Sequence, residues 1–320
     1  MNGHVSMAPC DRVDWGTPQA PTSATSSAAP DTTAIPAPGH VTHPPTPPAR
    51  LVTAATAPPA ASRLDRALAS YLASDDPVPA AAAHEIGDGD FRAIGAEFLR
   101  HFVQAGGLSP NDDVLDIGCG FGRMALPLAH WLAPRARYVG FDIVPEPVEW
   151  CRAHVAPRRE GFAFEHVDFH HPLYNPGGAV PASAGFLGRI PAPLGWRPSF
   201  IAAVSVFTHL ERAPLVRLLA DSHDILRPGG RLFLTAFLTG LGTPAPAAGA
   251  VFPVAAWREA APLCALLGEP FTAAVGVSRI WLDEVLSALG FRLETVVFGH
   301  WRRGHDPDAP FQDIVVVTRT

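Results

Sequence analysis

The sequence predicts an α/β fold with a doubly wound, mostly parallel sheet of seven strands, the last of them antiparallel. Short apolar runs alternate with stretches of helical periodicity from residue 114 onward, as in strand-helix-strand units. Three glycines, Gly118, Gly120 and Gly122, follow the first apolar run, where a strand turns into a helix. Together these features indicate a Rossmann-like sheet with a ligand at the ends of its strands.

The composition is that of a folded chain with restricted options for chemistry. The chain has 320 residues and 48% hydrophobic content, and its formal net charge of −6 argues against the basic face that nucleic acid requires. The four cysteines form no CxxC pair, so we expect a reducing, cytoplasmic location and no zinc ribbon. We expect no signal peptide and no membrane span. The sequence lacks lysine, which excludes a Walker A lysine and a Schiff-base lysine.

The chain divides by composition into a tail and a domain. Residues 1–60 are rich in Pro, Ala, Ser and Thr and are expected to be disordered, because they bury too little apolar surface to offset their ordering entropy. Residues 61–320 are expected to form one domain, opening with a helix capped by Ser62. A second helix should end at the pair Gly106 and Gly107. A long insertion is expected at about 238–278.

The remaining elements follow from runs of apolar residues and from helical spacing. The expected strands are Val114–Ile117, Tyr138–Phe141, Phe162–Val167, Phe200–Ser205, Arg231–Phe237, Leu293–Phe298 and Ile314–Val317. The expected helices between them are Met124–Leu132, Pro145–Ala156, Pro214–Leu226 and Trp281–Leu289. Long connections after the third and fifth strands are expected to act as binding loops.

The glycine cluster predicts a backbone cradle for a ligand. Glycine permits positive φ and close approach, and the following helix N-terminus adds N–H donors. In the dinucleotide fingerprint GxGxxG the third glycine would stand at position 123, where the chain has Arg123. This spacing argues against a bound diphosphate, although a nicotinamide-dependent oxidoreductase stays an alternative.

Five segments carry a family resemblance: VLDIGCGFGR, YVGFDIV, FEHVDF, SVFTHL and LRPGGRLFLTAFL. In this order they resemble the motifs of class I S-adenosylmethionine-dependent methyltransferases. GDFRAIGAEFLRHF, YNPGG, SVFTHL and FQDIVV further resemble a bacterial subgroup of that class. The resemblance implies a methyltransferase domain over 61–320 with S-adenosylmethionine as its cofactor. Ser199 departs from the pattern, since the fourth strand of the family commonly opens with Asp.

Candidate cofactor residues lie at the ends of the first strands. Asp142 can accept hydrogen bonds from both hydroxyls of a ribose, and Ile143 can pack on the face of the purine. Asp168 is a candidate acceptor for the adenine amine, beside the backbone of Phe169. Asp116 and the glycine loop are expected to hold the methionine part, whose ammonium and carboxylate need an acceptor and a donor. The full candidate set is Asp116, Gly118, Cys119, Gly120, Gly122, Arg123, Asp142, Ile143, Asp168, Phe169 and Ser205.

Candidate catalytic and acceptor-binding residues follow the fourth strand and the two long loops. His209 is the candidate general base for an acceptor hydroxyl, and its alternative is a structural histidine that bonds nearby backbone. Tyr174 and His300 are candidate acceptor-binding residues. A hairpin before the last strand is expected to edge the acceptor pocket with His300, Arg302, Arg303, Gln312 and Asp313.

The predicted acceptor is a hydroxyl of a small molecule or saccharide. The NPPY type of motif of many nucleic-acid and amide methyltransferases does not follow the fourth strand, which favours oxygen over nitrogen. No metal is expected, because adjacent His170 and His171 point to opposite sides of the chain. A non-catalytic binding or scaffold protein that keeps the fold stays a third possibility.

Overall fold

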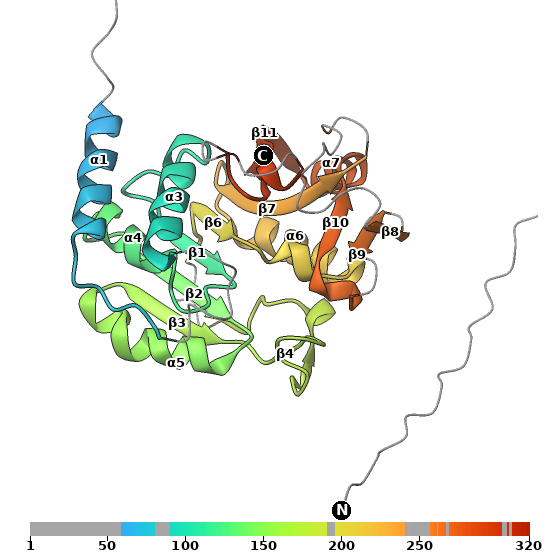
Figure 1. The fold of residues 1–320 in the computed structure, drawn as a ribbon, viewed down its shortest axis with the longest axis horizontal. Coiled ribbons are helices and arrows are strands. Elements are labelled where there is room, and N and C mark those ends of the chain that lie inside the picture. The colour runs from blue at the N-terminus through green and yellow to red at the C-terminus, as the bar shows by residue number, and fades with distance from the viewer. Residues whose placement is uncertain are drawn as a thin grey trace, which may run out of the picture. The chain divides into compact units, whose positions relative to one another are not determined.

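The computed structural model describes residues 59–80, 90–190, 196–240, 243, 257–260, 262–266, 269–302, 306 and 309–320 (Figure 1). The chain divides into two compact units, residues 1–53 and 54–320, and all of these described residues belong to the second. The tail expected at 1–60 therefore lies outside the described residues, apart from its last two positions, which open a helix.

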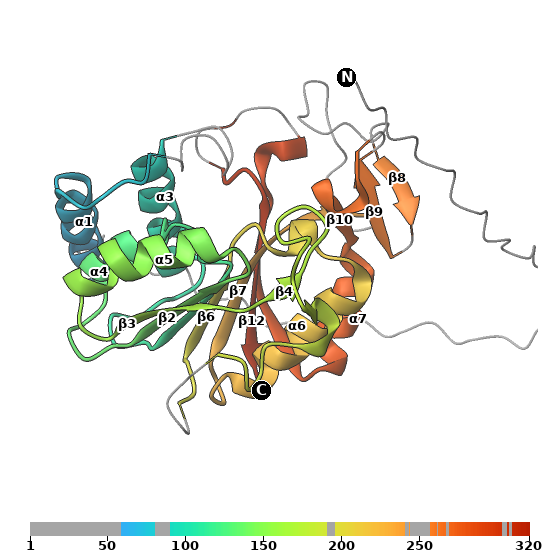
Figure 2. The same ribbon diagram turned by 90° about the horizontal axis from the view of Figure 1, so that it is seen from below.

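A parallel sheet forms the centre of the described unit, with the strand order β3-β2-β1-β6-β7. β12 pairs antiparallel with β7, and β11 pairs antiparallel with β12 (Figure 2). All seven predicted strands are present, and the antiparallel last strand is confirmed. Their bounds are β1 Val114–Ile117, β2 Tyr138–Asp142, β3 Phe162–His166, β6 Phe200–Ala203, β7 Arg231–Thr239, β11 Phe291–Val297 and β12 Asp313–Arg319.

Three further strands correct the predicted number. The described part of the main sheet has ten strands, because the insertion contributes β8 (Trp257–Ala260), β9 (Leu263–Leu266) and β10 (Val275–Ser278). β7 pairs with β12 up to Ala236 and then pairs with β10 from Phe237 onward. The long β7 thus exchanges one edge partner for another, and the insertion widens the sheet at the carboxyl end of β7.

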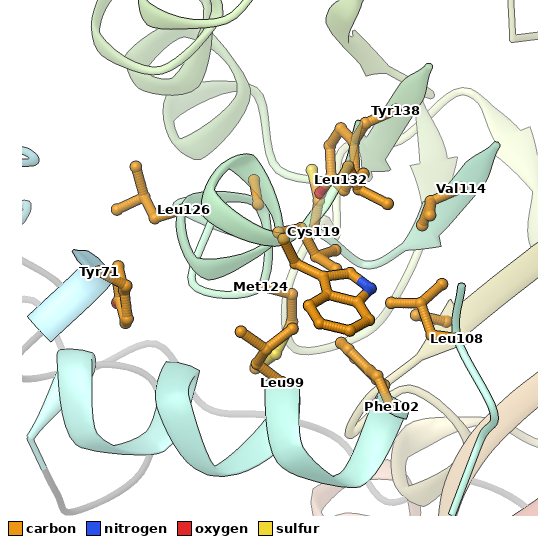
Figure 3. Close-up of a cluster of buried hydrophobic side chains, with 14 of the residues drawn as sticks. Tyr71, Leu99, Phe102, Leu108, Val114, Cys119, Met124, Leu126, Leu132 and Tyr138 are labelled. Atoms are coloured by element: carbon orange, nitrogen blue, oxygen red, sulfur yellow. The ribbon is translucent and has the colours of Figure 1, made fainter. Parts of the chain in front are cut away.

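Helices cover both faces of the sheet, as a doubly wound fold requires. One apolar core lies between the sheet and α1, α3, α4 and α5, and the other between the sheet and α6 and α7 (Figure 2). In Figure 3, Leu99 and Phe102 point from α3 toward Met124, just before α4. The bounds are α1 Pro59–Leu72, α3 Phe91–Gln104, α4 Ala125–Trp131, α5 Pro145–His154, α6 Arg212–Ile225 and α7 Arg279–Ala288.

Two boundary predictions were wrong for reasons visible in the backbone. α1 begins at Pro59, so Ser62 lies inside the helix and does not cap it; the fixed φ of proline suits a first turn. β6 ends at Ala203 instead of Ser205, because Ser205 has a φ of 58° and leaves the extended region. Among the described helices, none has the length and apolar content that crossing a membrane requires.

A two-stranded sheet stands apart from the main one, after β3. β4 (Phe169–His170) pairs with β5 (Val180–Pro181), and the YNPGG segment closes the loop between them. Backbone bonds between His171 and Asn175 brace this loop at 2.9 and 3.0 Å. Residues 169–181 of the first long connection therefore form a hydrogen-bonded structure.

Candidate active site

The glycine loop adopts the backbone that its sequence predicts. Gly118, Gly120 and Gly122 have φ values of 73°, 48° and 72°. A Cβ on Gly118 would stand 2.6 Å from Val206 Cγ2, so a side chain there would meet both strain and a clash. The N–H groups of Gly118 and Cys119 donate to the carbonyl of Phe141 at 2.9 and 3.0 Å, which ties the loop to the end of β2.

Asp142 links the loop to the start of α5. Its Oδ2 accepts from Gly120 N–H at 2.8 Å and its Oδ1 accepts from Val144 N–H at 2.9 Å. The side chain is half-buried, and burial raises its pKa, although these two donors oppose that effect. A carboxylate offers about four acceptor positions, so Asp142 keeps some acceptor capacity beyond these bonds. Ile143 beside it is half-buried against the apolar core.

Asp116 lies beneath the loop with its carboxyl enclosed. The residue is 1% exposed, and Tyr138 Oη donates to Asp116 Oδ2 at 2.5 Å. Burial raises the pKa of Asp116 to about 7, and the hydrogen bond from Tyr138 opposes this effect. Its role toward a methionine group stays a prediction.

Two other loop residues point into the core beside α3 and α5. Cys119 is buried, and burial raises the pKa of its thiol. The guanidinium of Arg123 lies 5.3 Å from the centre of the Phe91 ring, and burial lowers its pKa. Both side chains therefore serve the packing of the loop, and cofactor contacts of Cys119 and Arg123 stay predictions.

The groups predicted for adenine instead brace the YNPGG loop. Asp168 accepts from Ala179 N–H and from Asn175 Nδ2, each at 3.1 Å, and these bonds lower its pKa. The N–H of Phe169 donates to the carbonyl of Val167 at 2.7 Å. Contacts of Asp168 and Phe169 with adenine stay predictions, and each would have to coexist with these bonds.

His209 and Tyr174 come together although 35 residues separate them. His209 Nδ1 lies 2.9 Å from the carbonyl oxygen of Thr272; because a carbonyl only accepts, we assign the proton to Nδ1 and leave Nε2 as an acceptor. Burial lowers the pKa of His209, so its ring is neutral at pH 7. Tyr174 Oη lies 3.4 Å from each ring nitrogen. Burial raises the pKa of Tyr174, and the charge of Asp142 raises it further.

His171 positions this pair, a role that the sequence did not reveal. Its Nε2 donates to the carbonyl of His209 at 2.9 Å, and its Nδ1 accepts from the N–H groups of Leu173 and Tyr174 at 3.2 Å. His171 is buried and His170 is exposed, so the two side chains do point apart. Within the described residues, no group of His, Cys, Asp or Glu side chains is arranged to hold a metal ion.

A family model described as a methyltransferase domain matches residues 91–270, more than half of the chain. The chain belongs to this methyltransferase family. Structures similar to the methyltransferase include the 1,6-didemethyltoxoflavin-N1-methyltransferase of Burkholderia thailandensis, at 20% identity over 84% of this chain and 93% of that one, with a TM-score of 0.44. The magnesium protoporphyrin IX methyltransferase of Synechocystis PCC 6803 matches at 17% identity over 81% and 94%, with a TM-score of 0.44. A glycopeptide N-methyltransferase matches at 14% identity over 72% and 91%, with a TM-score of 0.45.

The methyltransferase also has a polar group where β6 and β7 end. Ser205 is the one described non-glycine residue with a positive φ. Its N–H donates to Thr235 Oγ1 at 2.8 Å, and its hydroxyl donates to Gln312 Oε1 at 3.3 Å. A strained residue at this edge is a common feature of functional sites. A cofactor contact of Ser205 stays a prediction.

Two of the five residues expected at the pocket edge of the methyltransferase lie inside the hairpin before β12. Arg302 and Asp313 are 1% and 0% exposed and form an ion pair inside the hairpin. Asp313 also accepts from Leu238 N–H, a buried backbone group of β7 that needs an acceptor. This bond explains why the ion pair is buried. His300 is half-buried, with its ring 5.4 Å from that of Phe311. Arg303 lies outside the described residues.

Proposed function

We propose that the chain transfers a methyl group from S-adenosylmethionine to a hydroxyl of a small molecule or saccharide. One observation carries the proposal: three glycines with positive φ stand at the end of β1, and Asp142 of β2 holds the N–H of the middle one at 2.8 Å. This arrangement offers bare backbone beside a carboxylate with spare acceptor capacity. It fits a nucleoside that carries an amino acid, because the ribose diol donates and the amino acid needs both donors and acceptors.

The methyl group of the cofactor is activated by its sulfonium, so this chain contributes mainly by positioning. Asp142 would accept from the ribose hydroxyls, and the N–H groups of the glycine loop would face the amino acid part. Tyr138 holds the carboxyl of Asp116 below the loop and keeps its position fixed. These residues would bind and orient, and none of them has to move a proton.

His209 is the residue of this site suited to proton transfer. The carbonyl of Thr272 holds Nδ1–H, so Nε2 is the basic nitrogen, and the neutral ring can accept a proton at pH 7. The hydroxyl oxygen of Tyr174 lies 3.4 Å from Nε2 of His209, so this side of the ring is accessible to a hydroxyl group. His209 would take the proton of the acceptor at Nε2.

Titration calorimetry with S-adenosylhomocysteine tests the cofactor assignment. We expect binding with a dissociation constant in the micromolar range, with one site per chain. The same titration with NADH separates the assignment from a nicotinamide-dependent oxidoreductase. Absence of S-adenosylhomocysteine binding at millimolar concentration would refute the proposal.

We expect His209→Gln to lower the turnover of a hydroxyl acceptor by about 100-fold, the lower end of general base effects, because a sulfonium needs little help from a base. Burial places the pKa of His209 below its ordinary value of 6.5. A base works when neutral, so wild-type turnover should rise with pH below that value and stay level above it, whereas the variant should lack this step. The measurement is release of S-adenosylhomocysteine between pH 5 and 9, using the best substrate of a hydroxyl panel.

Two controls accompany this pH profile. S-adenosylhomocysteine should bind the variant within about twofold of wild type, since His209 is assigned to the acceptor. His101→Gln, on α3 and away from the site, should leave the profile unchanged. A His209→Gln variant that keeps the wild-type profile would show that His209 is only structural.

A further inference from the structure

Gln312 stands at the same edge of the sheet as the proposed reaction site. β12 runs antiparallel to β7, and its first residue, Asp313, pairs with Ala236 near the end of β7. Gln312 therefore precedes β12 at the carboxyl ends of β6 and β7. Open α/β sheets bind their ligands at this edge.

The hydrogen bonds of Thr235 fix which end of the Gln312 amide faces inward. Thr235 is 0% exposed, and its Oγ1 accepts from Ser205 N–H at 2.8 Å. The buried hydroxyl proton needs an acceptor, and Gln312 Oε1 lies within hydrogen-bond distance. The hydroxyl of Ser205 donates to the same oxygen at 3.3 Å. Oε1 is thus committed to the protein.

The Nε2 of Gln312 is left as a donor. Within the described part of the chain neither of its protons meets an acceptor, and the side chain is half-buried. An amide that presents two N–H groups at a ligand-binding edge is a recognition group for an oxygen. The neighbouring Asp313 accepts from Gly299 N–H and Leu238 N–H, each at 2.8 Å, so the backbone that carries Gln312 is held rigidly.

The surroundings indicate the kind of molecule that would meet this donor. Ser205 and Thr235 are uncharged, and so is the neutral ring of His209. Tyr174, which lies beside His209, is 46% exposed and adds an aromatic surface to this site. Such a lining favours an uncharged molecule with a flat or apolar face and more than one oxygen.

We propose that Gln312 selects the methyl acceptor by donating from Nε2 to a second oxygen, adjacent to the hydroxyl that is methylated. The acceptor is then an uncharged compound with neighbouring oxygens, either a phenolic ring or a saccharide-type diol. The inference rests on the proposed methyl transfer and adds the residue that sets its specificity.

Gln312→Glu is the sharp test, because Glu keeps an oxygen for Ser205 and Thr235 and replaces the amide donor with an acceptor. The probes are catechol against phenol for the phenolic class, and vicinal cyclohexanediol against cyclohexanol for the saccharide-type class. We expect wild type to favour the two-oxygen probe of one pair by about tenfold in kcat/KM, as one hydrogen bond of ordinary strength gives. The variant should lose that preference and turn over both members of the pair at similar rates.

Three controls make the test decisive. Gln104→Glu, exposed at the end of α3, should match wild type with every probe. Gln312→Glu should bind S-adenosylhomocysteine and melt as wild type does, because the bonds of the framework persist. Unchanged preference in Gln312→Glu, equal turnover of both members of each pair by wild type, or no turnover of any probe by a protein that binds S-adenosylhomocysteine would each overturn this inference. Failure of wild type to bind S-adenosylhomocysteine would overturn the proposed function instead.

Discussion

Asp142→Ala is expected to raise the dissociation constant of S-adenosylhomocysteine by about 100-fold. The carboxylate accepts from Gly120 N–H and Val144 N–H at 2.8 and 2.9 Å, and each hydrogen bond to a charged group contributes about 1.5–3 kcal/mol. The variant loses these bonds together with the acceptor for the ribose hydroxyls. A loss of about 3 kcal/mol corresponds to the expected 100-fold change, and titration calorimetry measures it.

Asp142→Asn separates the two parts of this effect. Asn keeps the shape and one acceptor oxygen, but its NH2 group would face an N–H donor, so binding should lie between wild type and Asp142→Ala. Asp283→Asn on α7 removes a carboxylate from a surface pair with Arg279 and should bind as wild type does. If Asp142→Ala bound S-adenosylhomocysteine within threefold of wild type, the cradle would not be the cofactor site.

Much of the fold could be predicted because each central strand is an apolar run followed by a helix with a regular stripe. The predicted bounds of the seven strands and of α4 to α7 lie within two residues of those observed. The insertion could not be predicted in this way. Pairing of β10 with the last residues of β7 depends on where β12 begins, opposite Ala236, and no local pattern encodes that point.

The site divides along the same line. Glycine spacing and an acid after the second strand are local signals, and they pointed to Gly120 and Asp142, which the structure joins by a hydrogen bond. The backbone carbonyl of Thr272 orients His209. Because a residue of any type supplies such a carbonyl, the contact could not be predicted from the sequence. Gln312 reaches Ser205 across 107 residues, a contact that only the folded sheet creates.

Some polar residues that were expected at the pocket edge are buried in the structure. Arg302 and Asp313 lie in a polar segment and were expected at a pocket edge, yet both are buried. Sequence shows the charges but not the backbone N–H groups that they satisfy. Sequence reasoning therefore missed the buried acids and histidines that hold the backbone of the site in place. Asp313 accepts from Gly299 N–H, and His171 accepts from Leu173 N–H.

Asp313→Ala is expected to destabilise the fold by about 3–5 kcal/mol, the cost of removing one partner of a buried ion pair. Arg302 would keep its charge in the core, and the N–H groups of Leu238 and Gly299 and Nε1 of Trp301 would lose their acceptor. For a domain of this size such a loss lowers the melting temperature by about 10–15 °C, which calorimetry or circular dichroism measures.

A surface pair gives the matched control for this prediction. Nη2 of Arg292 and Oε1 of Glu294 lie 2.6 Å apart on β11, and the side chain of Arg292 is 62% exposed. Glu294→Ala should therefore lower the free energy of unfolding by less than about 1 kcal/mol. Asp313→Asn should fall between the two, because it keeps one acceptor oxygen but leaves Arg302 uncompensated. A melting temperature of Asp313→Ala within about 2 °C of wild type would contradict the assigned role.

Asp313 holds the backbone next to Gln312. Loss of Asp313 should therefore speed hydrogen exchange of the backbone around Ser205 and Gln312, whereas Glu294→Ala should not.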